Sequence, residues 1–255
     1  MIPRLAILLL TLGASLAIAQ NGHTVEPSPT PVPEKAAGSV KPVMEKLDAS
    51  HYRIGKVILD QKTREIQFPA RVSDPNMRLE YLIVQEKGKL YESLLFTDIS
   101  PTHLNLAFTL LRYPASRELY ALPVKSGAEP IKFPAVPDNI KAGARISISV
   151  EWKEEGKTRR VSVNDWIRHA VKTTAMPEGP WVYGGSEFHD GKFDPETTGD
   201  IVAILTARSA LVNYPGQDNQ NGEEWWPFLK RMPSADTEVT VIITPYQSSI
   251  TNSKP

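Results

Sequence analysis

The segment GKLYESLLFTDISPTHLNLAFTLL, residues 88–111, places a glutamate, a serine, an aspartate and a histidine within twelve positions. These side chains serve enzymes as general bases, nucleophiles and proton carriers. The segment also lies where a β-rich run gives way to a helical pattern. The residues therefore belong either to a catalytic site or to an ordinary strand-to-helix junction.

Glu92 is the unusual residue of this segment. We expect residues 87–88 to form the two-residue turn of a hairpin, which places Glu92 on the same strand face as Leu94, opposite Ile83 and diagonally near Tyr81. Burying an unpaired carboxylate costs several kcal/mol, so Glu92 requires a hydrogen-bonding partner or a raised pKa. It is either an acceptor that braces the sheet or a general base.

Asp98 and His103 flank Ser100-Pro101, which is a typical N-cap and first residue of a helix. The helix dipole stabilises an aspartate at this place and favours the neutral form of a histidine in the first turn. Together with Ser93, these residues have the three side-chain types of a Ser/His/Asp triad. The sequence around Ser93 lacks the nucleophile elbow, so it gives little support to such a triad. The catalytic interpretation therefore takes Glu92 as general base, with His103 and Asp98 nearby.

Four aromatic residues form a second candidate site. Trp181 and Tyr183 alternate on one predicted strand face, and Trp225 and Trp226 lie in the polar segment NGEEWWPF. Exposed tryptophan and tyrosine rings stack on sugars and on proline-rich segments. The four residues predict a ligand-binding surface, against the alternative that they fill the core.

Metal sites have little support. HDGKFDPETTGD, residues 189–200, is dense in oxygen ligands that Ca²⁺ accepts, but its spacing does not match the twelve-residue calcium loop. The histidines at 51, 103, 169 and 189 lack the spacing of a zinc site. Because the chain contains no cysteine, disulfides, thiolate metal sites, iron–sulfur clusters and cysteine nucleophiles are excluded. We expect no metal and no cofactor.

The N-terminus has the three parts of a secretory signal peptide: Arg4, the apolar run 5–12 and the small-residue ending 17–19. We expect cleavage after Ala19 and export to a periplasm or to the outside of the cell. The apolar run is shorter than the roughly 20 residues that span a bilayer, and no later segment has that character. Removal of Arg4 from the 29 basic residues leaves an excess of one acidic residue, which favours neither nucleic acid nor anionic membrane as a partner.

The predicted organisation is simple. Residues 20–44 are rich in proline, serine and charge and predict a flexible spacer. Residues 45–246 are long enough for one domain, with an alternative division near 125–140. Residues 247–255 predict a disordered tail.

Hairpin patterns dominate the predicted domain. Pairs of β-rich runs lie within 56–72, 78–97 and 145–163, and Asp190-Gly191 is the strongest turn dipeptide. Two further runs, "DIVAIL" and "EVTVIIT", predict interior strands.

Helices are few. One is predicted over 101–111 after the Ser100 cap, and shorter ones over 163–172 and 206–216. The predicted fold class is therefore α+β, with a mainly antiparallel sheet of hairpins and two or three short helices.

Several segments together resemble one family. REIQFPARV followed by LEYLIVQEKGKLYESLLFTDISPTHLNLAFTLL, and later GPWVYGGSEFHDGKF and ALVNYPG, resemble the YdjY-type domain of exported bacterial proteins over much of residues 50–215. The resemblance implies that the protein is exported. It implies no particular activity, because the family has none established. Tyr91 stands where a histidine often precedes the glutamate, and Arg112 where a glycine often closes the helix. The resemblance therefore gives no support to a metal or proton-transfer role that would need that histidine.

Two functions from different classes remain. The first, which we favour, is a non-catalytic exported module that binds an envelope protein or a glycan through an aromatic and acidic surface. The second is a cysteine-free hydrolase or isomerase that uses Glu92. Binding through the aromatic residues does not need the Glu92 carboxyl group, whereas catalysis does. The sequence indicates neither the ligand nor the oligomeric state.

Overall fold

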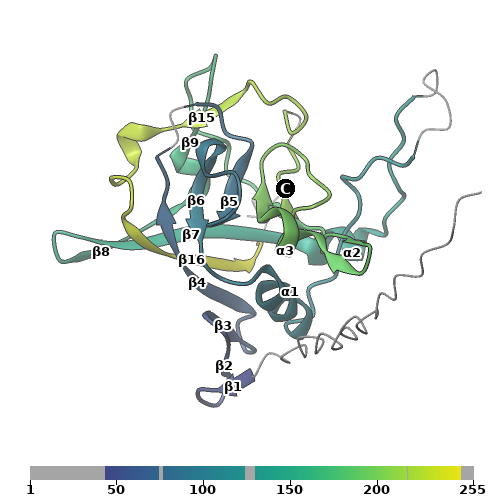
Figure 1. Cartoon of the computed structure of the whole chain (residues 1–255), viewed down its shortest axis with the longest axis horizontal. Helices are drawn as coiled ribbons and strands as arrows, with labels where there is room; N and C mark the ends of the chain where they lie inside the picture. The colour runs from purple at the N-terminus through teal and green to yellow at the C-terminus, as the bar shows by residue number, and fades with distance from the viewer. Residues whose placement is uncertain (1–43, 75–76, 124–129, 217, 248–255) are drawn as a thin grey trace, which may run out of the picture. The chain divides into compact units, whose positions relative to one another are not determined.

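The computed structural model describes residues 44–74, 77–123, 130–216 and 218–247, which lie in one compact unit (Figure 1). The predicted signal peptide and nearly all of the predicted spacer and tail lie outside the described residues. Strands on both sides of the alternative division near 125–140 belong to the same sheet.

Eight strands of this unit close into a barrel. Around the barrel they follow the order β4, β16, β7, β10, β14, β13, β5 and β6, and β6 pairs again with β4. Neighbours are antiparallel except for the parallel pairs β13–β14 and β5–β6. The strands are β4 (Glu65–Val72), β5 (Tyr81–Gln85), β6 (Ser93–Thr97), β7 (Arg145–Glu154), β10 (Trp181–Tyr183), β13 (Asp200–Ala203), β14 (Val212–Asn213) and β16 (Glu238–Pro245).

The remaining strands extend this barrel or form small ribbons. β1, β2 and β3 continue the sheet from β4, and β8 pairs with the projecting end of β7, which Figure 1 shows at the left. The ribbons β11–β12 and β9–β15 are separate. The bounds are β1 (Met44–Lys46), β2 (His51–Ile54), β3 (Val57–Asp60), β8 (Lys157–Ser162), β9 (Ile167–His169), β11 (Phe188–His189), β12 (Lys192–Phe193) and β15 (Trp225–Pro227).

The predicted α+β class is wrong. The described residues are mostly β, with three short α-helices: α1 (Pro101–Leu110), α2 (Asp138–Ala144) and α3 (Asp194–Thr198). Single 3₁₀ turns occur at η1 (Leu90–Glu92), η2 (Val163–Trp166) and η3 (Leu229–Arg231). Hairpins alone would leave open edges, whereas the pairing of β6 with β4 closes the sheet on itself.

Three predicted hairpin turns are confirmed. β3 pairs with β4, β7 with β8, and β11 with β12, each antiparallel. Asp190 and Gly191 have φ of 49° and 75°, and Glu155 and Gly156 have 49° and 76°. Two successive left-handed residues are the geometry of tight hairpin turns, which explains why Asp190-Gly191 is an informative signal.

The predicted hairpin around residues 87–88 is wrong, because β5 and β6 run parallel with Tyr81 opposite Ser93. The connection 86–92 turns back along the strands and contains η1. Both strands are buried on both faces over most of their length, which is the pattern of parallel strands. The alternation expected of a half-exposed hairpin is therefore absent.

The helix predictions had mixed outcomes. α1 is confirmed: the Ser100 side chain accepts a hydrogen bond from His103 N–H, and Pro101 occupies the first position. Residues 163–172 form η2 and β9 instead of a helix, and residues 206–216 form a loop and β14. In both segments β-branched and aromatic residues pair with distant strands, and this tertiary pairing overrides the weak helical pattern. α2 and α3 were not predicted.

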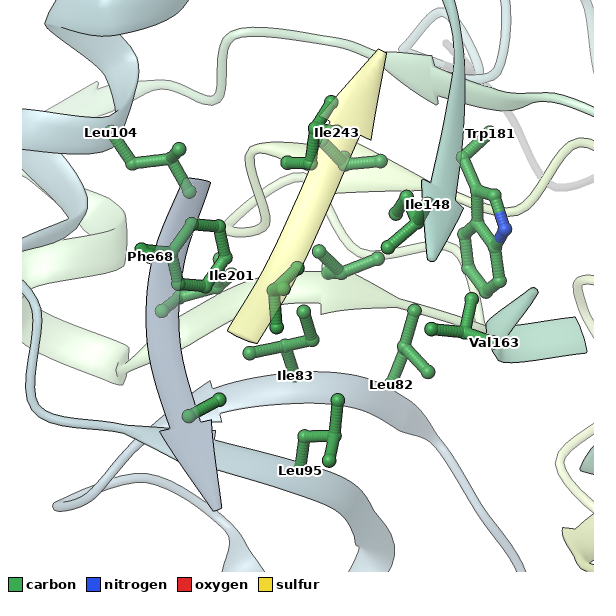
Figure 2. Packing of buried hydrophobic residues seen from close by; sticks show 14 of the residues in the cluster. Phe68, Leu82, Ile83, Leu95, Leu104, Ile148, Val163, Trp181, Ile201 and Ile243 are labelled. Carbon is green, nitrogen blue, oxygen red and sulfur yellow. The ribbon is translucent and has the colours of Figure 1, made fainter. Parts of the chain in front are cut away.

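The barrel interior is the main hydrophobic core (Figure 2). Phe68 of β4, Ile148 of β7 and Ile243 of β16 are almost completely buried, as is Leu104 of α1, which packs against β3. Burying one such side chain contributes roughly 1.5–3 kcal/mol. This core fixes the strands whose ends and outer faces carry the polar residues described below.

Candidate functional site

Glu92 is the last residue of η1, directly before β6, and is 8% exposed. Its carboxylate lies 3.5 Å from Lys89 Nζ. Burial, followed by the charge of Glu80, raises the pKa of Glu92 against the opposing charge of Lys89. A buried carboxyl group with a raised pKa has a property of general bases.

Lys89 links Glu92 to Tyr81. Its Nζ donates a hydrogen bond to Tyr81 Oη at 3.1 Å and lies 4.9 Å from the centre of the ring. This hydrogen bond raises the pKa of Lys89, and burial raises the pKa of Tyr81. Sequence reasoning placed Tyr81 near Glu92 but missed Lys89, although a lysine three residues before a glutamate was a usable signal.

Asp98 and His103 lie beyond the other end of β6. Glu92 precedes and Asp98 follows this five-residue strand, which is about 17 Å long at ~3.3 Å per residue. Asp98 forms an ion pair with Lys56. The ring of His103 packs against Gly55, where no room remains for a Cβ atom.

Ser93 is buried, and its hydroxyl donates to the carbonyl of Leu90 at 3.0 Å. The structure therefore does not bring Glu92 together with Asp98 or His103, and it gives Ser93 a structural hydrogen bond. The residues predicted as one catalytic group occupy both ends of β6.

Trp181 and Tyr183 are core residues, so the expectation that they are exposed is wrong. Trp181 is fully buried, and its Nε1–H donates to Asn164 Oδ1 at 3.0 Å. Tyr183 stacks on Phe108 with ring centres 4.2 Å apart and donates its hydroxyl to Asn105 Oδ1 at 2.7 Å. Phe108 and Asn105 of α1 thus cover the Tyr183 ring, whereas the Trp181 ring lies 5.5 Å from the ring of Tyr214.

Trp225 is also buried, contrary to expectation, whereas Trp226 is half-buried. β15 pairs with β9, and this places the Trp225 ring edge-on to His169 with centres 5.3 Å apart. The Arg168 guanidinium lies 6.0 Å from the centre of the Trp226 ring. Of the four predicted ligand-binding aromatics, only Trp226 offers appreciable surface.

The acidic segment 189–200 serves the fold around α3. Glu196 accepts hydrogen bonds from the Ser100 hydroxyl and from Thr102 N–H, the latter at 2.9 Å, and so caps α1. Burial alone would raise the pKa of Glu196, but these hydrogen bonds lower it. His189 Nδ1 lies 2.7 Å from Asp194, and this contact raises the pKa of His189.

Asp200 is buried and accepts a hydrogen bond from the Ser209 hydroxyl. Within the residues that the structure describes, no group of three or more histidine, aspartate or glutamate side chains is arranged to hold a metal ion.

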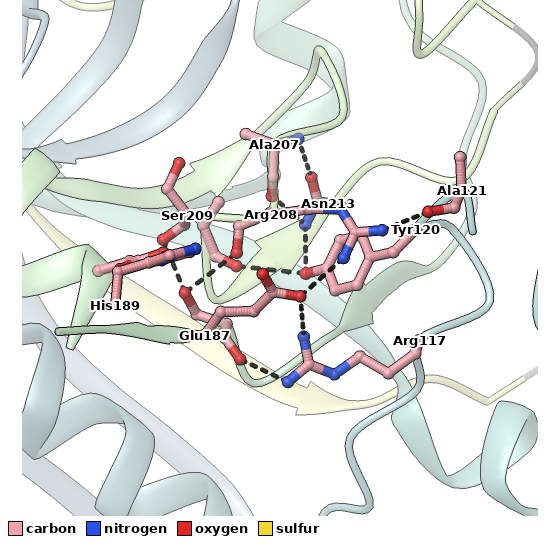
Figure 3. A network of polar contacts seen from close by, with 12 residues as sticks. Arg117, Tyr120, Ala121, Glu187, His189, Ala207, Arg208, Ser209 and Asn213 are labelled. Carbon is pink, nitrogen blue, oxygen red and sulfur yellow. Dashed lines mark hydrogen bonds and ion pairs between the residues drawn. The ribbon is translucent and has the colours of Figure 1, made fainter. Parts of the chain in front are cut away.

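Two arginines form a polar network that sequence reasoning did not single out (Figure 3). Arg117 and Arg208 both bind Oε1 of Glu187, at 3.2 and 2.8 Å. Their guanidinium groups lie 5.3 and 5.4 Å from the centre of the Tyr120 ring, and Tyr120 Oη accepts from Asn213 at 3.1 Å. The network joins three segments that are distant in the sequence. The two arginines and Glu187 therefore have a structural role.

A groove of about 590 Å³ crosses the outer face of β6, β4, β16 and β7. Strand pairing orders its floor: Phe96, Arg71 and Glu238 form one cross-strand row. Pro69, Thr240 and Glu151 form the next row. At ~4.8 Å per strand, four strands extend the groove roughly 14 Å across the sheet.

Charges of both signs line this groove. Arg71 pairs with Glu238 at 2.8 Å, with side chains 50% and 79% exposed, and Lys56 pairs with Asp98 at one end. Of the predicted catalytic residues, only Asp98 lies here. The remaining lining residues are Ala70, Glu86, Thr97, Trp152, Lys153 and Val239. Sequence reasoning missed the groove because its residues come from six separate segments of the chain.

No helix in the described part of the chain is both long enough and apolar enough to cross a membrane. No curated protein and no solved structure matches the sequence. Residues 57–244 match the YdjY domain, as the resemblance implied. This match runs from β3 into β16 and so includes the barrel except for Pro245 and the groove lining except for Lys56. The chain therefore belongs to the YdjY domain family, whose function is uncharacterised.

Proposed function

We propose that the protein is a non-catalytic exported binding module that holds a polypeptide segment of an envelope partner in the groove across β6, β4, β16 and β7. The groove itself is the observation that carries this proposal. Its extent of roughly 14 Å fits about four residues of an extended chain at ~3.3 Å per residue.

The ion pairs of the groove favour a ligand with charges of both signs. Exposed pairs such as Arg71–Glu238 contribute only about 0–1 kcal/mol, because water screens them. A ligand carboxylate or ammonium group can therefore replace one member of the pair at small cost. Phe96 and Pro69 supply apolar floor between the charges.

A polypeptide fits this surface better than a glycan. Sugar rings are bound by the open faces of aromatic side chains. Trp181, Tyr183 and Trp225 are buried, and Trp152 of the groove is only 9% exposed. The proposed binding surface therefore consists mainly of paired charges, and the buried aromatic residues belong to the protein interior.

The test is selection of a phage-displayed random peptide library on the immobilised full chain, followed by affinity measurements on the enriched peptides. We expect peptides with both acidic and basic residues, and at least a tenfold loss of affinity, about 1.4 kcal/mol, in Arg71→Glu. Arg53→Glu is the matched control, since Arg53 forms an exposed pair with Glu45 and does not line the groove. Failure to enrich any peptide, or equal losses in both variants, would overturn the proposal.

One observation favours the enzymatic alternative, a hydrolase or isomerase with Glu92 as general base: burial raises the pKa of this residue. His103 and Asp98 are too distant to assist, so the chemistry would rest on Lys89 and Tyr81. Glu92→Gln separates the two functions, because binding in the groove does not involve Glu92. Peptide binding that depends on Glu92 would count against the binding module.

A further inference from the structure

Asn221 and Gly222 lie in the exposed connection that precedes β15. A glycine that follows an asparagine leaves its own backbone nitrogen accessible to the asparagine side chain, because glycine has no Cβ. A Cβ built on Gly222 would meet no atom closer than 3.8 Å. Within the described residues, the N–H of Gly222 has no hydrogen-bond acceptor. Among the described residues, no hydrogen bond therefore competes for this nitrogen.

The side chain of Asn221 makes two hydrogen bonds with different chemical consequences. Its Oδ1 accepts from Glu223 N–H at 3.1 Å, and its Nδ2 donates to Glu224 Oε1 at 2.8 Å. A donor on Oδ1 stabilises the negative charge that forms there when a nucleophile attacks Cγ. A carboxylate beside Nδ2 is placed to shuttle a proton to the departing nitrogen.

We propose that Asn221 is a deamidation site whose reaction is assisted by Glu223 N–H and by the Glu224 carboxylate. The Gly222 nitrogen loses its proton and attacks Cγ of Asn221, forming the new C–N bond. The Cγ–Nδ2 bond breaks and ammonia leaves with the proton, which yields a cyclic imide. Water then opens the imide to aspartate or isoaspartate, so the net change consumes one water and releases one ammonia.

The product alters a partly buried contact between Glu224 and His169. Glu224 Oε2 lies 3.1 Å from Nε2 of His169, which is 6% exposed. Nδ1 of His169 accepts from the N–H groups of Val171 and Lys172, at 3.2 and 3.3 Å. Deamidation replaces the amide donor to Glu224 with a second carboxylate, and the two negative charges repel. The displaced Glu224 then weakens its contact with His169 at the end of the β9–β15 ribbon.

The first test is peptide mapping by mass spectrometry after incubation of the full chain at mildly alkaline pH. Asn21, the other asparagine followed by glycine, is the internal reference, and Asn219, followed by glutamine, is the unreactive control. We expect conversion at Asn221 but not at Asn219, and several-fold slower conversion in Gly222→Ala and in Glu224→Gln with Asn21 unchanged. Conversion at Asn21 while Asn221 stays intact would overturn the proposal, as would an unchanged rate in Glu224→Gln.

The second test uses Asn221→Asp as a stable product. Hydrogen exchange at the amides of Val171 and Lys172 should become several-fold faster, because their acceptor His169 is loosened. Amides of β16, which belongs to the barrel sheet and not to this ribbon, provide the reference. Unchanged exchange rates at both residues would contradict the claim that deamidation of Asn221 loosens His169.

Discussion

Gly199 and Gly88 meet backbone against backbone: a Cβ atom on Gly199 would lie 2.9 Å from the Cα of Gly88. Gly199 ends α3 with φ of +81°, and its carbonyl accepts from Gln85 N–H at 2.7 Å. The contact places the connection 86–92 against the start of β13. It thereby supports the route by which the chain turns back from β5 into the parallel strand β6.

Gly199→Ala should destabilise the protein by about 1–3 kcal/mol, since it combines a left-handed conformation with a steric clash. Gly156→Ala is the matched control, because Gly156 has φ of +76° but no atom within 4 Å of a Cβ. Urea unfolding of both variants gives the free energy of unfolding that each loses, and the difference between the two losses is the cost of the steric clash at Gly199. Equal losses would show that the close approach of Gly88 is unimportant.

Glu92→Gln should stabilise the protein at neutral pH. The pKa of Glu92 is raised in the folded chain, so ionisation of this residue is less favourable there than in the unfolded chain. The resulting loss of folding stability is fully present only above the folded pKa. Below the unfolded pKa of about 4.3 both states are protonated and the difference disappears. Denaturant unfolding at neutral and at acidic pH measures it. A variant less stable than wild type at neutral pH would instead assign a bracing role to the carboxylate.

Glu196→Gln should have the opposite effect on stability. The folded pKa of Glu196 is lowered, so its contribution is present above the unfolded pKa of about 4.3 and is lost as pH falls through the folded value. Because the residue is exposed, we expect a loss of only about 0.5–1 kcal/mol at neutral pH. Glu154→Gln, which affects an exposed pair with Arg159, is the control. A loss that persists in acid would contradict a role of the charge.

The parts of the fold that sequence analysis predicted depend on local signals. The Ser100-Pro101 cap and the Asp190-Gly191 turn act within a few residues, and both are confirmed. The parallel pairing of β5 with β6 depends on a contact between residues near 88 and 199, which no local pattern contains. The hairpin prediction failed there for this reason.

The candidate site follows the same division. Glu92 was identified from its sequence context, and its burial agrees with the expected anomaly. Trp225 lies between polar neighbours in the sequence, yet pairing of β15 with β9 buries it. The groove combines residues from Lys56 to Thr240, so only the closed sheet assembles it.

Trp181→Phe distinguishes a core residue from a surface platform. The substitution leaves a small cavity and removes the donor to Asn164 Oδ1, which is buried with the ring. An unsatisfied buried acceptor costs about 1–3 kcal/mol, to which the cavity adds. Trp226→Phe, at a half-buried position, should cost less than about 1 kcal/mol. Urea unfolding with tryptophan fluorescence and circular dichroism measures both variants. If Trp181→Phe were as stable as wild type, neither the hydrogen bond to Asn164 nor the packing of the larger ring would contribute to stability, which would contradict the role of Trp181 as a core residue.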